Sequence, residues 1–218
     1  MHKIVSNFIS IKDEIKSQIK NDDQNIDIIA VSKTFSIEQI NPLIIFGHNH
    51  FGENKVQEAI TKWKAIKEFN HNIKLHLIGK LQLNKVKFAI PIFDYIHSLD
   101  NIRLANKIFD QEKKINKKVK IFIQINIDNE TQKNGIKKED LIDFYNYCFK
   151  ELNLDIIGLM CIPPNNQNTN DYFKQMKDLN SKIKLRHLSM GMSNDYLNAI
   201  QNGATFVRIG SKIFGSRD

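Results

Sequence analysis

The stretch Asp27-Ile28-Ile29-Ala30-Val31-Ser32-Lys33-Thr34 decides how the chain is organised. Its apolar, β-branched residues are typical of a strand that is buried on both faces of a parallel sheet, and the stretch ends on a lysine. Burial of an ammonium group is costly and lowers the pKa of the lysine. A neutral amine at this position can form a Schiff base with an aldehyde or ketone. The alternative is that Lys33 lies at the edge of the strand and extends its amine into water.

The composition is that of an ordinary globular protein, with 218 residues of which 41% are hydrophobic and 26% are charged. The formal net charge is +8, from 32 Lys and Arg against 24 Asp and Glu. Because arginine is rare, the excess is nearly all lysine, and lysine is abundant together with asparagine and isoleucine. We interpret this basicity as the product of an AT-rich genome and expect no nucleic-acid partner.

Cysteine usage and the N-terminal residues bear on the compartment. Cys148 and Cys161 show no metal-ligand spacing, as expected of a reduced chain in the cytoplasm. Charged residues interrupt positions 1–20, which excludes a signal peptide or a membrane span there, and no later apolar run is long enough to cross a bilayer. We therefore expect a cytoplasmic protein with no membrane partner.

Hydrophobic periodicity predicts a regular alternation of strands and helices. The predicted strands are 27–34, 48–51, 74–78, 95–99, 118–127, 155–161, 185–190 and 205–209. The predicted helices are 3–20, ended by the polar stretch 21–25, then 36–47 with Ser36 as its cap, 53–69, 84–90, 101–113, 138–151, 170–183 and 195–202. Eight such units favour a single (β/α)₈ barrel domain spanning 1–218, with the N-terminal helix in the place of a missing eighth helix.

The carboxyl ends of the predicted strands carry polar and small residues, which is where such barrels place their chemistry. These ends are Lys33-Thr34, Gly52-Glu53-Asn54, His76 with Gly79, Ser98, Asn126, Met160, Ser189 to Ser193, and Arg208-Ile209-Gly210-Ser211. Since they meet at one face, we expect a ligand-lined mouth.

Two of these ends are suited to a phosphate group. The segment 189–194, Ser-Met-Gly-Met-Ser-Asn, follows a strand and opens a helix, and Gly210-Ser211 follows the next strand. Backbone N–H groups and hydroxyls at such places bind anions, and barrels often hold phosphate after strands seven and eight. Asp195 would repel a phosphate, so we expect it to point outward. The alternative is that Ser193 only caps the helix.

Arg208 and the histidines near strand ends allow further interpretations. A buried arginine stays charged and needs an acceptor, which could be Glu53 in an ion pair or a ring nitrogen of the ligand. An arginine at a pyridine nitrogen would keep that nitrogen unprotonated and weaken the ring as an electron sink. The pair His48-x-His50 is too weak a pattern to predict a metal site, and we expect none.

Several segments together resemble the alanine-racemase-type barrel and, specifically, the pyridoxal 5′-phosphate (PLP) homeostasis protein family, also called the proline synthetase co-transcribed protein family. They are 30–34 (AVSKT), 51–58 (FGENKVQE), 76–85 (HLIGKLQLNK), 158–160 (GLM), 188–193 (LSMGMS) and 208–215 (RIGSKIFG). The resemblance covers nearly the whole chain. Lys80 and Leu83 lie where the family varies, and Ser211 takes a place often held by threonine.

That resemblance implies a cofactor and a set of residues that bind it. Lys33 would carry PLP as an internal aldimine. The phosphate would be held by Ser189, Ser193, Gly210 and Ser211, with backbone N–H groups around Gly191 and Met192. Arg208 would face the pyridine nitrogen, and Asn54 and Met160 would line the ring.

The resemblance also implies a role in vitamin B6 homeostasis, in which the chain binds PLP, buffers it and hands it to PLP-dependent apo-enzymes, without catalytic residues of its own. The family is similar to the barrel of alanine racemase without the C-terminal β-domain, which brings a tyrosine base to the ring. Because this chain ends at Asp218, we expect no two-base racemisation, and we expect a monomer or weak dimer. The alternatives are a PLP-dependent amino-acid racemase of low activity and a Schiff-base aldolase without cofactor.

Overall fold

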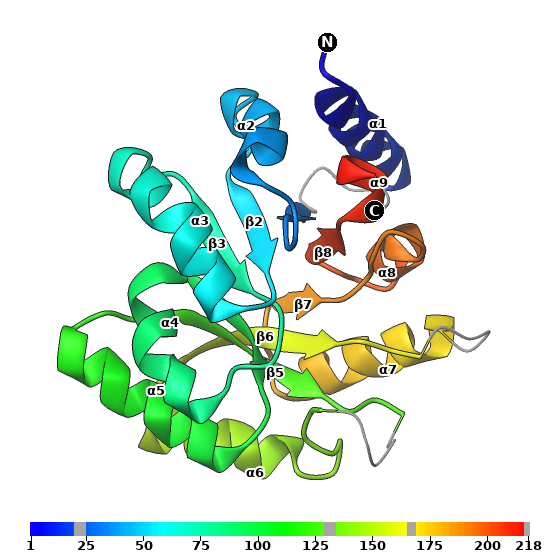
Figure 1. The fold of residues 1–218 in the computed structure, drawn as a ribbon. Coiled ribbons are helices and arrows are strands. Elements are labelled where there is room, and N and C mark those ends of the chain that lie inside the picture. The colour runs from blue at the N-terminus through cyan, green and yellow to red at the C-terminus, as the bar shows by residue number, and fades with distance from the viewer. Residues whose placement is uncertain (20–24, 129–133, 165–168, 216–218) are drawn as a thin grey trace.

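Eight parallel strands close into a barrel in the computed structural model, which describes residues 1–19, 25–128, 134–164 and 169–215 (Figure 1). In chain order they are β1 (Asp27–Val31), β2 (His50–Glu53), β3 (Lys74–Leu77), β4 (Tyr95–Leu99), β5 (Lys120–Ile125), β6 (Asp155–Cys161), β7 (His187–Ser189) and β8 (Phe206–Ile209). Each strand pairs with the next, and β8 pairs with β1. The predicted barrel is therefore confirmed.

Helices follow the strands and cover the outside of the barrel (Figure 1). They are α1 (Lys3–Gln18), α2 (Ile37–Ile45), α3 (Val56–Phe69), the 3₁₀ turn η1 (Leu83–Lys85), α4 (Val86–Ile92), α5 (Ile102–Ile115), α6 (Leu141–Asn146), the π-helical η2 (Tyr147–Glu151), α7 (Thr169–Lys182), α8 (Tyr196–Gln201) and α9 (Ser211–Phe214). Ser36 caps α2 in a capping box with Gln39, as such a sequence predicts. Most of the predicted stretch 21–25 lies outside the described residues.

The N-terminal helix takes the place of the eighth outer helix. It packs against α2, α8 and α9, so it closes the ring of helices between the first and last units (Figure 1). The side-chain amide of Asn7 donates to the carbonyl of Ile213 in α9 at 3.0 Å. The short helix α9 was not predicted, because four residues are too few to show a helical period.

Two apolar layers lie on opposite sides of the strands. The larger core fills the space between the strands and the helices, as in other barrels of this type. The smaller one fills the barrel interior and consists of Ile29, Tyr95, Phe122, Met160 and Phe206. Buried polar side chains share that interior, among them His76, His97, Ser189 and Arg208. The barrel is therefore a filled core whose polar groups must satisfy one another.

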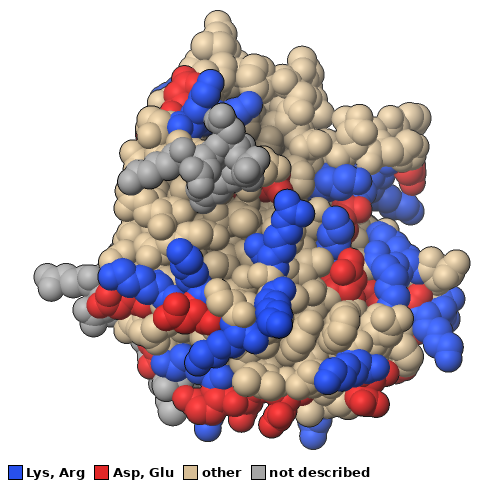
Figure 2. Space-filling model, turned by 180° about the vertical axis from the view of Figure 1, so that it is seen from behind, with Lys and Arg blue, Asp and Glu red and all other residues tan. Residues whose placement is uncertain are grey.

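Lysine and arginine side chains are spread over the molecule rather than gathered into one band. On the face shown in Figure 2 they are interspersed with acidic side chains. Pairs such as Lys118 with Glu112, at 2.9 Å, and Lys67 with Asp94 neutralise part of the excess locally. Among the described residues, no helix combines the length and the apolar character needed to span a bilayer.

Gly158 permits the close approach of β6 and β7 that positions the barrel interior beneath the strand ends. It pairs with His187, and a Cβ atom there would lie 2.1 Å from the carbonyl oxygen of His187. Such contacts explain why glycine occupies a strand interior despite its conformational cost.

We predict that Gly158→Ala destabilises the protein by about 1–3 kcal/mol, because β6 and β7 must move apart. Urea unfolding followed by circular dichroism measures this free energy. A change within about 0.5 kcal/mol, the size expected for an uninvolved surface substitution, would show that the strands accommodate the methyl group.

Candidate functional site

A cavity of about 610 Å³ opens at the carboxyl ends of the strands. Its walls come from the loops after β1, β2, β3, β7 and β8, together with residues of β5 and of the segments around 134 and 162. The residues expected to bind a ligand that line it are Lys33, Asn54, Met192, Ser193, Arg208, Gly210 and Ser211. Lys80 and Asp195, which were not predicted as ligands, also line it.

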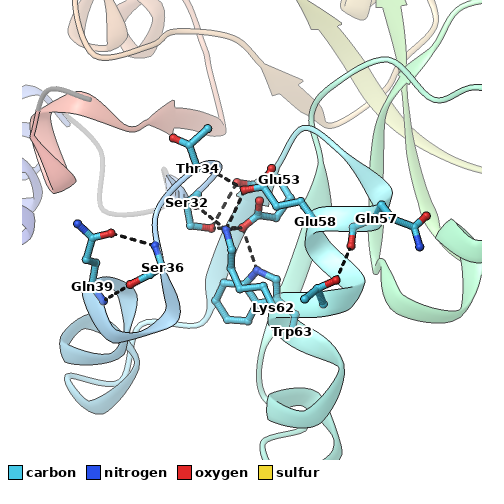
Figure 3. A network of polar contacts seen from close by, with 11 residues as sticks. Ser32, Thr34, Ser36, Gln39, Glu53, Gln57, Glu58, Lys62 and Trp63 are labelled. Atoms are coloured by element: carbon cyan, nitrogen blue, oxygen red, sulfur yellow. Dashed lines mark hydrogen bonds and ion pairs between the residues drawn. The ribbon is translucent and has the colours of Figure 1, made fainter. Parts of the chain in front are cut away.

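Lys33 lies in the loop that follows β1, half-buried and at the wall of the cavity. The backbone of the next residue, Thr34, has a φ of 69°, in the left-handed region that non-glycine residues rarely adopt. The Thr34 N–H donates to Glu58 Oε1 at 2.6 Å, and Lys62 Nζ donates to the Ser32 carbonyl at 2.9 Å (Figure 3). The residues on both sides of Lys33 are thus held by α3, which restricts where the amine can reach.

The carboxylate of Glu53 anchors this support. It is fully buried, and its Oε1 accepts from Ser32 Oγ at 2.7 Å, Trp63 Nε1 at 2.9 Å and Lys62 Nζ at 3.0 Å (Figure 3). Lys62 also contacts Glu58 Oε1 at 3.1 Å. A buried carboxylate needs this compensation, because an unpaired one is strongly destabilising. The suggested ion pair between Glu53 and Arg208 is therefore wrong, since Lys62 is the partner of Glu53.

Arg208 places a buried cation at the base of the cavity. Its side chain is only 4% exposed, and it donates through one amino group to Ser189 Oγ at 2.7 Å and through the other to the Cys161 carbonyl at 2.8 Å. Burial lowers the pKa of the guanidinium, which is so basic that it remains charged at neutral pH. The acceptors are neutral oxygens, so the positive charge stays available to a ligand.

Ser189 and Met160 do not line the cavity, contrary to the expectation. They pair with each other across β6 and β7 and are fully buried in the barrel interior. The Ser189 hydroxyl bonds to Arg208 and to His97 Nδ1, at 2.9 Å from the latter, and Met160 packs with Phe122 and Phe206. Both side chains point inward beneath the strand ends, so Ser189 supports Arg208 and does not contact a phosphate at the rim.

The opposite rim is formed by the loop after β7 and the start of α9. Ser193, Gly210 and Ser211 lie together there, and the Gly210 N–H donates to Ser193 Oγ at 3.4 Å. Gly191 is itself buried, but it shapes the loop: its φ is +89°, and a Cβ would lie 2.6 Å from that of Ala199. This turn is what exposes Met192 and Ser193 to the cavity.

Asp195 was expected to point outward, and this is wrong. It lines the cavity and its Oδ1 accepts from the Met192 N–H at 2.6 Å. A carboxylate next to the predicted anion seat ties up one N–H group that a phosphate would use. Lys80 lies at the same cavity, where its Nζ donates to Asn134 Oδ1 at 2.7 Å.

Asn54 lines the cavity, and Gly79 holds the neighbouring loop against it. A Cβ at position 79 would lie 2.4 Å from the Asn54 carbonyl oxygen, so only glycine permits this contact. Cys161 is fully buried, and burial raises the pKa of its thiol to about 12, as it also does for Cys148. Neither thiol is a nucleophile at neutral pH. Within the described ranges, no group of three or more His, Cys, Asp or Glu side chains is arranged to hold a metal ion.

Comparison with known proteins places this geometry in a family. The model of the alanine racemase N-terminal domain matches residues 12–218. A pyridoxal phosphate homeostasis protein of Aquifex aeolicus (strain VF5) is 38% identical over 199 residues, which cover 87% of this chain and 86% of the relative.

Solved structures agree with this match. PipY of Synechococcus elongatus PCC7942 without PLP has a TM-score of 0.88 and 31% identity, covering 97% of this chain and 100% of PipY. The same protein with PLP bound has a TM-score of 0.85. The chain belongs to the alanine racemase N-terminal domain family and, within it, to the pyridoxal phosphate homeostasis proteins.

Proposed function

We propose that this chain binds PLP covalently through Lys33 and acts in vitamin B6 homeostasis as a carrier without turnover of its own. The observation that carries this proposal is that one cavity joins an amine, a buried guanidinium and a hydroxyl-bearing rim. These are Lys33, Arg208 and the segment from Ser193 to Ser211 through Gly210. The structure of PipY with PLP bound supports the assignment for a relative of the same fold.

The charges of the lining residues suit an anionic ligand. Lys33, Lys80 and Arg208 face Asp195 as the ionisable groups of the described lining, so positive charge exceeds negative charge. Hydroxyls and backbone N–H groups at the rim are the donors that bind phosphate oxygens best when they converge. A phosphate at the rim would draw the Met192 N–H away from Asp195, so the carboxylate must turn aside when the ligand enters.

When bound, the cofactor supplies an aldehyde that condenses with a lysine amine and gives a visible absorption band. The chain contributes position: Glu53, Lys62 and Glu58 hold the loop of Lys33 in place. Arg208 would donate to the pyridine nitrogen and cannot protonate it, because guanidinium does not release its proton. An unprotonated ring withdraws electrons poorly, which favours carriage over chemistry at the α-carbon of an amino acid.

The proposal extends to where the ligand goes. We infer that the recipients are PLP-dependent apo-enzymes, that the chain works in the cytoplasm as a monomer or weak dimer, and that it folds as one domain. The open cavity supports transfer, because its walls are loops at the surface rather than a closed shell.

We predict that the purified protein incubated with PLP shows a visible band that borohydride bleaches, and that Lys33→Ala removes it. Lys80→Ala is the matched control, since it removes another amine from the same cavity and should keep the band. Absorption spectroscopy with a PLP titration measures both. A Lys33→Ala protein that develops the same band with the same affinity would contradict the proposal.

The same sample separates the alternative functions. A racemase would convert L-alanine to its D-isomer, whereas a carrier leaves it unchanged. An aldolase without cofactor would stay colourless with PLP and cleave a sugar phosphate.

We predict that Ser193→Ala/Ser211→Ala weakens retention of PLP by about 1.5–3 kcal/mol for each lost hydrogen bond to the charged phosphate. Equilibrium dialysis against PLP measures the affinity. Ser181→Ala is the control, because that hydroxyl lies on α7 and bonds the Lys177 carbonyl, away from the cavity. Unchanged affinity in the double variant would place the phosphate elsewhere.

A further inference from the structure

A chain of buried side chains runs through the barrel interior and ends at Arg208. His50 Nδ1 lies 2.9 Å from His76 Nε2, and His76 Nδ1 lies 2.9 Å from His97 Nε2. His97 Nδ1 lies 2.9 Å from Ser189 Oγ, which accepts from Arg208 at 2.7 Å. The chain connects β2, β3 and β4 with β7 and β8, so it crosses the barrel. It uses three histidines that the proposed binding of PLP does not explain.

The rings in this chain are fixed by packing. His76 and His97 are fully buried. His76 stacks on Tyr95 with a centroid separation of 4.1 Å and an interplanar angle of 11°, and His97 stacks on Phe122 at 4.3 Å and 19°. Rings held between aromatic neighbours cannot turn freely to exchange donors and acceptors. The hydrogen-bond pattern of the chain is therefore set by its ends.

Arginine sets the direction of the chain because it can only donate. Ser189 Oγ accepts from Arg208, so the Ser189 hydroxyl hydrogen goes to its other partner, His97 Nδ1. A neutral His97 then carries its hydrogen on Nε2 and donates to His76 Nδ1, and His76 Nε2 donates in turn to His50 Nδ1. In the opposite direction His97 and Arg208 would both donate to Ser189, and the buried hydroxyl hydrogen would lack both of these acceptors.

The surroundings keep the histidines neutral. Burial and the charge of Arg208 hold the pKa of His97 well below its usual value, and burial with the neighbouring histidines and Lys67 does the same for His76. The pKa of His50 is also lowered, mainly by burial. The charged groups that face His50 are Asp27, Lys74, Asp94 and Lys120. No carboxylate takes part in the hydrogen bonds of the chain, so its one formal charge is that of Arg208.

The chain is suited to positioning and not to proton delivery. A guanidinium at its end does not release a proton, so nothing can pass from the histidines to a ligand in the cavity. What the chain can do is hold the Ser189 oxygen as an acceptor and thereby hold one amino group of Arg208. The Cys161 carbonyl holds the other. Together they aim the remaining N–H groups of the guanidinium.

We propose that His97, acting through Ser189, is the positioning residue for Arg208, and that His76 and His50 lock the tautomer in which His97 accepts. The ligand contact that this orientation serves rests on the proposed binding of PLP. In this arrangement the barrel interior aims the guanidinium at the ring of the ligand. The hydrogen-bonded chain itself exists with or without the ligand.

Two substitutions at one position test this proposal with opposite expected effects. His97→Phe keeps an aromatic ring against Phe122 but removes the acceptor, whereas His97→Asn loses the ring but keeps an oxygen close to the position of Nδ1. We expect His97→Phe to weaken PLP affinity by about tenfold, as for one hydrogen bond to a charged group, and His97→Asn to retain most of it. The control is His187→Phe, whose ring contacts Thr205 and Phe206 outside the chain.

The reverse order, with His97→Asn binding worse than His97→Phe, would show that packing alone matters and would overturn the proposal. Equal affinity of both variants and the wild type would also overturn it. Wild-type protein that fails to take up PLP at all would instead count against the proposed function. Thermal unfolding of each variant shows whether it folds.

The tautomers provide a test that needs neither variants nor ligand. Two-bond ¹H–¹⁵N NMR of the wild-type protein at neutral pH should show His76 and His97 neutral, with hydrogen on Nε2 and none on Nδ1. A protonated Nδ1 on His97, or an imidazolium, would reverse the direction of the chain and contradict the proposal.

Discussion

A guanidinium buried inside a closed barrel constrains most of this site. Arg208 cannot lose its charge, and the barrel interior offers it no carboxylate, so neutral oxygens and a ligand must satisfy its donors. Ser189 and Cys161 supply those oxygens from the two preceding strands. Because the compensation from the protein is incomplete in charge, the site attracts a partner with a lone pair or negative charge above the strand ends. A pyridine ring that carries a phosphate has both.

Closure of the barrel brings the two halves of the site together. β1 pairs with β8, with Ile29 opposite Arg208, so the first and last strands of the chain are neighbours. The loop of Lys33 therefore borders the loop of Gly210 and Ser211, although they lie at opposite ends of the sequence. The network around Glu53 and Lys62 then supports the amine from α3. An amine and an anion seat are thus presented on adjacent walls without any moving part.

The sequence predicted the residues whose role depends on strand ends. Strand length and apolar content reveal where a strand stops, so Lys33, Asn54 and Gly210 were located at the cavity. Depth below the rim is different, because it depends on how strands are staggered around the barrel. Ser189 and Met160 lie one layer lower than their neighbours in sequence suggest, and their side chains point into the interior.

Contacts between distant elements were also beyond the sequence. The histidine chain joins four strands and a serine, and nothing in local spacing shows that inward positions of different strands coincide. The alternation of His76 between Leu75 and Leu77 indicated an inward side chain, but not its partners. Asp195 was misplaced because a backbone N–H of its own turn, that of Met192, holds it at the cavity.

The central claim is that one particular amine is the point of attachment. Reduction of the PLP-loaded protein with borohydride, followed by proteolysis and mass spectrometry of the peptides, measures this directly. The account predicts a pyridoxyl group on Lys33 at a stoichiometry close to one per chain. Modification of Lys80 or of surface lysines, with Lys33 unmodified, would contradict it.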